Sequence, residues 1–483
     1  MYKKALLAVT ILLFLFFSVN LVFSAGDFFK GLAMINDVHT MVKEHYVEPG
    51  DVRDQDMAYR AIKGMLEGLD PHTAFFDPEE SRDMITDIEG SFGGLGIRID
   101  KKGDFVVVVS PIEGTPAYRM GIQAGDKIVE VDGESAVGLS LEKVISMLRG
   151  DIGTKVRVSI QREGVADLLT FEIVREKIEL PSLSGTFMID ETTGYIRFIH
   201  FQENSLEEMK KALAGLKAEG MEKLILDLRY NPGGILEIAH GIADLFIPRG
   251  EVIVSTRGRD GILLEEYRST DPTPYADISL ALLVDRGSAS ASEILAGAVK
   301  DLKRGLIIGE KTYGKGSVQR IYSLRDGSAL KMTIAYYYTP GGTCVDGTGI
   351  EPDITVESRP LPVQLVDLLR GNHIEDFTAK RTDITAEAGD ETILSSFREN
   401  LEKEGYDFKE HFIGDGVNAA LITEYVPDWK GKIFDAIAEE LIRQIRYRLI
   451  YRDSGEEAAR LYLAGDDPVI EKAREALSEK GGR

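Results

Sequence analysis

The sequence contains a single cysteine, Cys344, among 483 residues. An intrachain disulfide is therefore excluded, because it needs two cysteines. The seven histidines are scattered, and no cysteine and histidine cluster has the spacing of a zinc site. We therefore expect neither a metal nor a cofactor, and we expect Cys344 to be a small buried apolar group.

Positive charge is also scarce. Lys and Arg number 57 against 80 Asp and Glu, which gives a formal net charge of -23. Binding to nucleic acid needs clustered Lys and Arg to neutralise phosphates, so this balance argues against a nucleic-acid partner. The hydrophobic fraction of 43% is typical of globular proteins, and the length of 483 residues predicts two to four domains.

One long apolar run stands at the N-terminus. Lys3 and Lys4 precede the apolar stretch Ala5–Phe17, and the small residues Ser24–Gly26 follow it. This pattern is typical of a secretory signal peptide cleaved after Ser24. The alternative is an uncleaved anchor, since residues 5–25 are long enough to cross a bilayer. Both interpretations predict an exported protein, periplasmic or extracytoplasmic, that meets the membrane through residues 1–25 if these are retained.

Hydrophobic periodicity divides the remaining chain into four regions. Residues 26–87 are expected to be helical, and residues 88–178 to form a small β-rich module. Residues 179–358 alternate between buried-type strands and helices, which predicts an α/β core with a largely parallel sheet. Residues 359–483 are expected to be helical and to serve packing, dimerisation or partner contact.

The β-rich module carries a glycine-rich loop, Gly93–Ile97, that runs straight into a strand. A turn at Ala124–Asp126 follows, and then a helix from Leu141 to Leu148 with Ser140 as its N-cap. Such a loop can capture a terminal carboxylate while the strand edge pairs with a peptide backbone, so the module resembles a PDZ domain. The alternative is a glycine cluster in a hairpin that binds nothing. The residues expected to bind peptide are Gly94, Leu95, Gly96, Ile97 and Arg149.

Arg149 lies directly after the helix of this module and before Gly150. A charged residue at this edge is a candidate link between peptide binding and the rest of the molecule. The alternative is an ordinary cation at a helix C-terminus.

A serine cluster, Ser288–Ser292, joins the apolar strand Ile278–Val284 to a helix. Ser290 would therefore lie at a helix N-terminus, where the backbone N–H of Ala291 is a natural oxyanion donor. The alternative is structural, because Ser290 and Glu293 also have the spacing of a capping box.

A serine nucleophile needs a base, and no G-x-S-x-G motif pairs this serine with a histidine. Lys315 is a candidate base if its surroundings keep the amine neutral. Gln319, four residues later, could hold that amine by a neutral hydrogen bond. The alternative is an exposed loop lysine.

Four separated motifs together resemble the carboxyl-terminal processing peptidases, also called tail-specific proteases. They are GSASASEILAG at 287–297, GEKTYGKGSVQ at 309–319, DLRYNPGG at 227–234 and GTGIEPD at 347–353. The resemblance implies a multidomain α+β protein whose α/β crotonase/ClpP-like core carries an inserted PDZ domain. It also implies Ser290 as nucleophile, Lys315 as base, Gln319 as the third member, and Gly233 or Gly234 as a second oxyanion donor.

The implied function is that of a serine endopeptidase that recognises protein C-termini and cleaves through an acyl-enzyme. The expected partners are protein substrates with exposed apolar C-termini, with a homodimer through the terminal helices and an adaptor as further candidates. Two other functions remain open at this point. A catalytically silent PDZ scaffold is disfavoured by the joint presence of Ser290, Lys315 and Gln319. A crotonase-type acyl-thioester enzyme is disfavoured by the export signal, because its cofactor is cytoplasmic.

Overall fold

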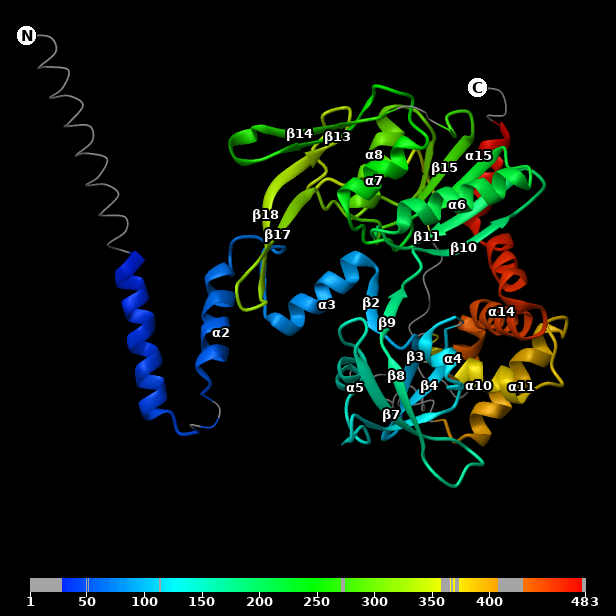
Figure 1. The fold of residues 1–483 in the computed structure, drawn as a ribbon. Helices are drawn as coiled ribbons and strands as arrows, with labels where there is room; N and C mark the ends of the chain where they lie inside the picture. The colour runs from blue at the N-terminus through cyan, green and yellow to red at the C-terminus, as the bar shows by residue number, and fades with distance from the viewer. Residues whose placement is uncertain are drawn as a thin grey trace, which may run out of the picture. The chain divides into compact units, whose positions relative to one another are not determined.

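The computed structural model describes residues 28–48, 50, 52–112, 114–270, 274–357, 365, 368–369, 373–406 and 429–479 (Figure 1). The expected signal peptide or anchor at residues 1–25 lies outside these ranges. None of the helices in the described ranges has the length and apolar character needed to cross a bilayer. The chain divides into two compact units, one of residues 1–82 and 319–333 and the other of residues 83–318 and 334–483.

The smaller unit contains the first expected helix, over residues 28–45, and a short strand that was not predicted. Its other elements are α2 (Asp54–Leu66), β1 (Ala74–Phe76), most of β17 (Ser317–Ser323) and the first half of β18 (Ala329–Tyr338). β1 pairs antiparallel with β18, with Phe76 opposite Ala329. The helix over 28–45 leaves several large apolar side chains in solvent, among them Phe28, Ile35 and Met41.

The β-rich module of the larger unit is an antiparallel sheet closed by helices. The strand order is β3-β4-β5-β7-β8, and β2 pairs separately with β9. The elements are α3 (Pro78–Glu89), β2 (Ser91–Gly94), β3 (Ile97–Lys102), β4 (Phe105–Pro111), α4 (Pro116–Arg119), β5 (Lys127–Val131), β6 (Glu134–Ser135), α5 (Leu141–Leu148), β7 (Lys155–Gln161), β8 (Leu169–Val174) and β9 (Glu176–Glu179). Ser140 caps α5 as predicted, because its hydroxyl accepts from the Lys143 N–H at 3.2 Å.

The core of the larger unit is a six-stranded sheet in the order β10-β11-β12-β15-β16-β19. Only the first pair, β10 with β11, is antiparallel, so the predicted parallel sheet is confirmed. The strands are β10 (Leu183–Met188), β11 (Thr193–Phe198), β12 (Lys223–Asp227), β15 (Ser279–Val284), β16 (Leu306–Gly309) and β19 (Ile354–Thr355).

Each face of this sheet is covered by a different set of helices (Figure 1). Leu224 and Leu226 of β12 pack with α6 (Ser205–Ala218), α7 (Leu236–Asp244) and α8 (Ala291–Asp301). The side chain between them, Ile225, packs with α15 (Pro468–Glu479) on the other face. Because successive side chains of a strand point to opposite faces, two apolar layers follow from one continuous apolar run.

A second, antiparallel sheet was not predicted. In the larger unit β13 (Val252–Arg257) pairs with β14 (Leu263–Arg268), and Ser255 to Arg257 also pair with the end of β18. The side chains of β14 are mostly exposed, so this strand lacks the apolar alternation by which strands are found in a sequence.

The C-terminal region is helical, as expected, and has a hydrophobic core of its own. Its described helices are α10 (His373–Lys380), α11 (Asp390–Lys403) and α14 (Trp429–Gly465). An apolar stripe of α14 is buried at Ile437, Leu441, Ile445 and Leu449. Gly455, with φ of 86° and ψ of 177°, breaks α14 into two arms.

Candidate active site

Ser290 occupies a strained turn between β15 and α8. Its φ of 56° and ψ of -115° are rare for a residue with a side chain, and α8 begins at the next residue, Ala291. Such backbone conformations cost on the order of 1–3 kcal/mol and persist where surrounding contacts enforce them. They cluster at functional sites, so this turn is the first structural reason to examine Ser290.

The two flanking serines hold this turn in place. The buried Ser288 hydroxyl donates to the carbonyl of Leu228 at 2.8 Å, and the buried Ser292 hydroxyl donates to the carbonyl of Asn231 at 3.0 Å. The Ala289 N–H reaches the same Asn231 carbonyl at 3.0 Å. Ser288 and Ser292 are therefore occupied in tying the serine turn to the loop after β12.

Glu293 connects the serine turn to the lysine segment. Its carboxylate is fully buried and accepts hydrogen bonds from the backbone N–H of Ser290 at 2.8 Å and of Lys315 at 2.9 Å. It also accepts from the Gly314 N–H at 2.7 Å and the Thr312 hydroxyl at 2.6 Å. Burial raises the pKa of Glu293 although all four hydrogen bonds oppose that rise.

From the sequence, Glu293 is expected only to cap the helix that follows Ser290. Its bond to the Ser290 N–H agrees with a capping box, but its other three partners lie on a segment some twenty residues away. The sequence carries no signal for those contacts, because loop geometry alone brings the two segments together.

A second buried group bridges the same two segments. The Tyr337 hydroxyl lies 2.6 Å from the backbone carbonyl of Lys315 and 3.0 Å from that of Ser290. The side chain of Lys315 is half-buried. The structure thus brings the backbones of Ser290 and Lys315 together through both Glu293 and Tyr337.

The glycine loop after β12 lies directly against Ser290. A Cβ built on Gly233, whose φ is 97°, would stand 2.7 Å from the Cβ of Ser290 and 2.7 Å from the N atom of Ala291. Only glycine fits there. The Gly233 N–H donates to the Asn231 side chain at 2.9 Å, so Gly233 can serve as an oxyanion donor only after that bond is exchanged. Gly234, the other candidate, packs its Cα against the carbonyl of Phe201.

Gln319 belongs to the smaller unit, where its side chain takes part in a chain of polar contacts. Its side-chain amide donates to the Thr333 hydroxyl at 3.4 Å, and that hydroxyl donates to the Asp70 carboxylate at 3.0 Å. Asp70 also accepts from the Thr73 hydroxyl at 2.5 Å, and its hydrogen bonds lower its pKa against the opposing effect of burial. The segment from Asp70 to Thr73 is thus a structural anchor for the hairpin of β17 and β18.

The residues predicted to bind peptide line one groove of about 180 Å³ in the β-rich module. Its lining comprises Phe92, Gly94, Leu95, Gly96, Ile97, Ile99, Ile145, Leu148 and Arg149. Phe92 was not among the residues predicted to bind peptide. The guanidinium of Arg149 lies over the ring of Phe92, 4.4 Å from its centroid, and 3.6 Å from the carboxylate of Asp83. The groove therefore has an apolar floor and a cation at one end.

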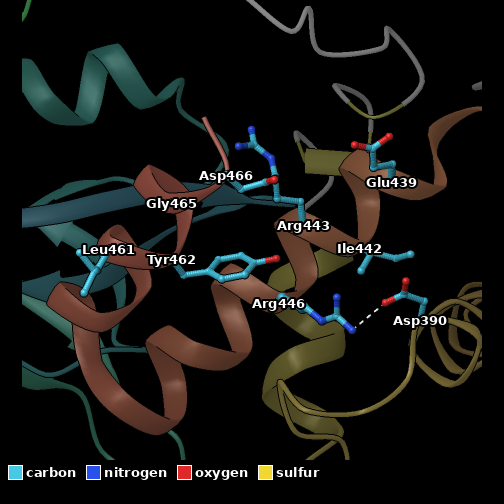
Figure 2. Close-up of a pocket in the computed structure, with 9 residues that line it drawn as sticks. All are labelled: Asp390, Glu439, Ile442, Arg443, Arg446, Leu461, Tyr462, Gly465 and Asp466. Carbon is cyan, nitrogen blue, oxygen red and sulfur yellow. Dashed lines mark ion pairs between the residues drawn. The ribbon is translucent and has the colours of Figure 1, made fainter. Parts of the chain in front are cut away.

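A larger hollow of about 490 Å³ lies in the C-terminal region (Figure 2). It is lined by Asp390, Glu439, Ile442, Arg443, Arg446, Leu461, Tyr462, Gly465 and Asp466. Arg446 reaches Asp390 at 2.6 Å, as the dashed line in Figure 2 shows, and donates to the carbonyls of Ala386 and Ala388. This arginine joins α14 to the start of α11, which is a structural use.

Cys344 is part of no metal-binding cluster among the residues that the structure describes. Cys344 is half-buried rather than buried, since it forms an isolated bridge with Tyr338 at the end of β18. The expectation of a buried thiol is therefore wrong. Across the described ranges, no three side chains of His, Cys, Asp or Glu gather closely enough to hold a metal ion.

Two parts of the chain match known protein families. The family described as "Peptidase family S41" matches residues 192–356, and the family described as "PDZ domain" matches residues 107–162. The chain is 40% identical over 340 residues to the carboxy-terminal-processing protease of Bartonella bacilliformis, covering 69% of this chain and 76% of that protein. It is 33% identical over 340 residues to the carboxy-terminal processing protease CtpA of Bacillus subtilis, covering 69% and 70%.

Two solved structures are also similar. The photosystem II D1 C-terminal processing protease is 31% identical, with a TM-score of 0.41, covering 70% of this chain and 96% of that chain. The PDZ domain of the carboxy-terminal protease of Vibrio cholerae, solved with a peptide, is 30% identical, with a TM-score of 0.18, covering 19% and 99%.

Proposed function

Because this chain belongs to the carboxy-terminal-processing proteases of peptidase family S41, we propose that it hydrolyses peptide bonds with Ser290 as nucleophile and Lys315 as base. Membership makes the protein a serine protease with a PDZ domain. The dyad itself is our proposal. The main support for this dyad is that one carboxylate, that of Glu293, accepts hydrogen bonds from the backbone N–H of both Ser290 and Lys315.

The proposed reaction begins with a proton transfer. The neutral amine of Lys315 takes the proton of the Ser290 hydroxyl as the oxygen attacks the scissile carbonyl. The N–H groups of Ala291 and of Gly233 or Gly234 stabilise the oxyanion, and loss of the amine product leaves an acyl-enzyme that water hydrolyses. Gln319 orients the amine of Lys315, a role that rests on the family motif. Because the base acts only when neutral, the rate should rise with pH.

Substrate recognition is proposed to occur in the groove of the PDZ domain. Its apolar lining suits an apolar C-terminal side chain, and the backbone of Gly94 to Ile97 suits a terminal carboxylate. Arg149 contacts both Phe92 in the groove and Asp83 outside it, and it is the proposed link between peptide binding in the groove and the rest of the molecule. Protein substrates with exposed apolar C-termini follow from this lining.

We also propose that the protein is exported, because residues 1–26 have the pattern of a signal peptide or anchor. N-terminal sequencing of the protein from separated cell fractions should find it outside the cytoplasm, either cut near Ser24 or retained in the membrane. An intact, soluble cytoplasmic chain would contradict this. The terminal helices are the proposed contact surface of a homodimer, and sedimentation of the full chain tests this proposal.

Cleavage of an unstructured protein that ends in an apolar residue tests the proposed activity. The wild type should degrade this substrate, and Ser290→Ala and Lys315→Ala should each abolish degradation while keeping the circular dichroism spectrum of the folded protein. Ser292→Ala is the matched control, since this serine contacts the Asn231 carbonyl and carries no proposed chemistry. Undiminished proteolysis by either dyad variant would refute the assignment.

A further inference from the structure

A cluster of buried and half-buried charges lies on the face of the core sheet that α15 covers. Asp227, at the end of β12, is fully buried and accepts from the Tyr195 hydroxyl at 2.8 Å. Its carboxylate also holds two guanidinium groups, that of Arg229 through Nε at 3.0 Å and Nη2 at 2.7 Å, and that of Arg197 at 2.7 Å. One carboxylate therefore faces two cations within the core.

The second carboxylate of this cluster comes from the C-terminal helix. Asp467 Oδ2 lies 2.8 Å from Arg229 Nη1, where the side chain of Arg229 is only 10% exposed. The cluster therefore contains two guanidinium groups and two carboxylates. This balance is important because an unpaired charge inside a protein lowers its stability. Asp467 Oδ1 has a separate task, since it accepts from the N–H of Val469 at 2.9 Å and caps α15.

Arg229 stands at the start of the loop that reaches the nucleophile. Its N–H donates to Asp227 and its carbonyl accepts from Arg197 at 2.7 Å. The next residue, Tyr230, has a φ of 57°, a conformation that surrounding contacts must enforce. The loop then runs through Asn231 to Gly233, whose Cα lies against Ser290.

The part of the chain that supplies Asp467 lies beyond the segment that matches the peptidase family, residues 192–356. Helix α15 is nevertheless a layer of the protease core, because Val469, Ile470 and Leu477 pack on β12, β15 and β16. A contact from this helix to the glycine loop is therefore a property of this chain's own C-terminal region.

We propose that Asp467 is a positioning residue for peptide-bond hydrolysis. Through Arg229 it holds the loop from Arg229 to Gly234 in the conformation that sets Gly233 beside Ser290. This inference rests on the proposed function of Ser290. The competing explanation is that Asp467 only caps α15 and anchors it to the sheet.

The variant Asp467→Asn separates these explanations. Asparagine caps a helix as well as aspartate does, so the cap remains while the negative charge beside Arg229 is lost. We expect kcat on an unstructured protein substrate to fall roughly 10- to 100-fold, with KM unchanged, because the loop beside Ser290 loses its alignment. Arg474→Gln is the matched control, because it removes another ion pair of the same helix, with Asp190 at 3.3 Å. This control should keep the wild-type kcat.

Three outcomes decide between the explanations. A wild type no more active than Ser290→Ala would overturn the proposed function and this inference together. An active wild type with an equally active Asp467→Asn would overturn the inference alone, and so would an equal loss of kcat in Arg474→Gln. All rates are taken well below the thermal unfolding midpoint of each variant. If Asp467→Asn does not fold, Asp467→Ser, which also caps without charge, replaces it under the same criteria.

Discussion

At the scale of single residues, the site depends on close backbone contact rather than on an array of side chains. Ser290 is held at a positive φ, and Gly233 lies so near that a Cβ would approach the Ala289 carbonyl to 2.6 Å. Glu293 connects the two segments that carry the proposed dyad, because its carboxylate accepts hydrogen bonds from the backbone N–H groups of both. Small changes at these positions should therefore affect activity.

Gly233→Ala should abolish proteolysis while leaving the protein folded. The added methyl group would collide with the backbone of Ala289 and Ala291 and would move the loop from Ser290. A displacement of about 1 Å in a catalytic site can lower kcat about 100-fold. Gly250→Ala is the control, because Gly250 has a similar φ of 91° and open space around it. Equal activity of the two variants would contradict the close approach.

Glu293→Gln should lower both kcat and the free energy of unfolding. An amide offers one acceptor oxygen where the carboxylate offers two, so buried N–H groups lose partners at a cost of about 1–3 kcal/mol. Urea unfolding and the proteolysis assay measure the two effects. Glu310→Gln, on the neighbouring loop and ion-paired with Arg286, serves as the control. A fully active Glu293→Gln would contradict the proposal that Glu293 holds the segments of Ser290 and Lys315 in the geometry needed for catalysis.

At the scale of elements, the ends of strands and helices place the functional groups. β12 delivers the charged pair of Asp227 and Arg229 to the face under α15, and β15 delivers Ser290 to the start of α8. In the PDZ domain, α5 ends at the groove and places Arg149 at its rim. The residue at which each of these elements ends therefore determines which side chain lies at the site.

Asp227→Asn tests the element that carries the buried charges. Two guanidinium groups hold the pKa of Asp227 well below its usual range against the opposing effect of burial. A depressed carboxyl pKa contributes stability above the unfolded pKa of about 4, and this stability is lost as pH falls toward the folded pKa. At pH 7 the variant should lose about 3–5 kcal/mol of unfolding free energy, the usual cost of breaking a buried pair.

In urea unfolding at lower pH, the difference in unfolding free energy between the wild type and Asp227→Asn should become smaller below a pH of about 4. The reason is that protonation of Asp227 then removes its ion pairs from the wild type as well. Asp383→Asn, which breaks the surface pair with Arg381, should leave the free energy of unfolding nearly unchanged, because exposed ion pairs contribute little. A difference for Asp227→Asn that stays constant with pH would contradict the ion-pair explanation.

Arg149→Ala tests the rim of the groove. If Arg149 links peptide binding in the groove to cleavage, the variant should cleave protein substrates more slowly. Its rate should also no longer depend on an apolar C-terminus of the substrate. Arg119→Ala is the control within the same domain, because Arg119 pairs with Glu176 outside the groove lining. Unchanged rate and unchanged C-terminal dependence in Arg149→Ala would end this proposal.

At the scale of the whole molecule, much of the fold and of the candidate site could be predicted from local patterns. The parallel strands are continuous apolar runs, and α5 has a cap and an amphipathic face, so both were predicted. The antiparallel sheet at β13 and β14 was missed because β14 is exposed and lacks alternation. The roles of Glu293 and Asp467 were missed because their partners are distant in sequence and no spacing rule connects them.

The C-terminal helix should be essential to the fold of the core. Removing residues 467–483 would expose the apolar face of the sheet that Val469, Ile470 and Leu477 cover. Each such side chain contributes about 1.5–3 kcal/mol on burial, so the truncated chain should lose at least about 5 kcal/mol and become insoluble or unfold at low temperature. Removal of residues 480–483 alone is the control. Wild-type thermal stability of the longer truncation would contradict the layer assignment.

The most direct test of the proposed dyad is the site at which a fluorophosphonate, a reagent for activated serines, modifies the full chain. We predict that mass spectrometry of the digested protein finds the adduct on Ser290, and that Lys315→Ala reacts far more slowly while Ser292→Ala reacts like the wild type. An adduct on another serine, or undiminished labelling of Ser290 in Lys315→Ala, would contradict the assignment of Lys315 as the base of Ser290.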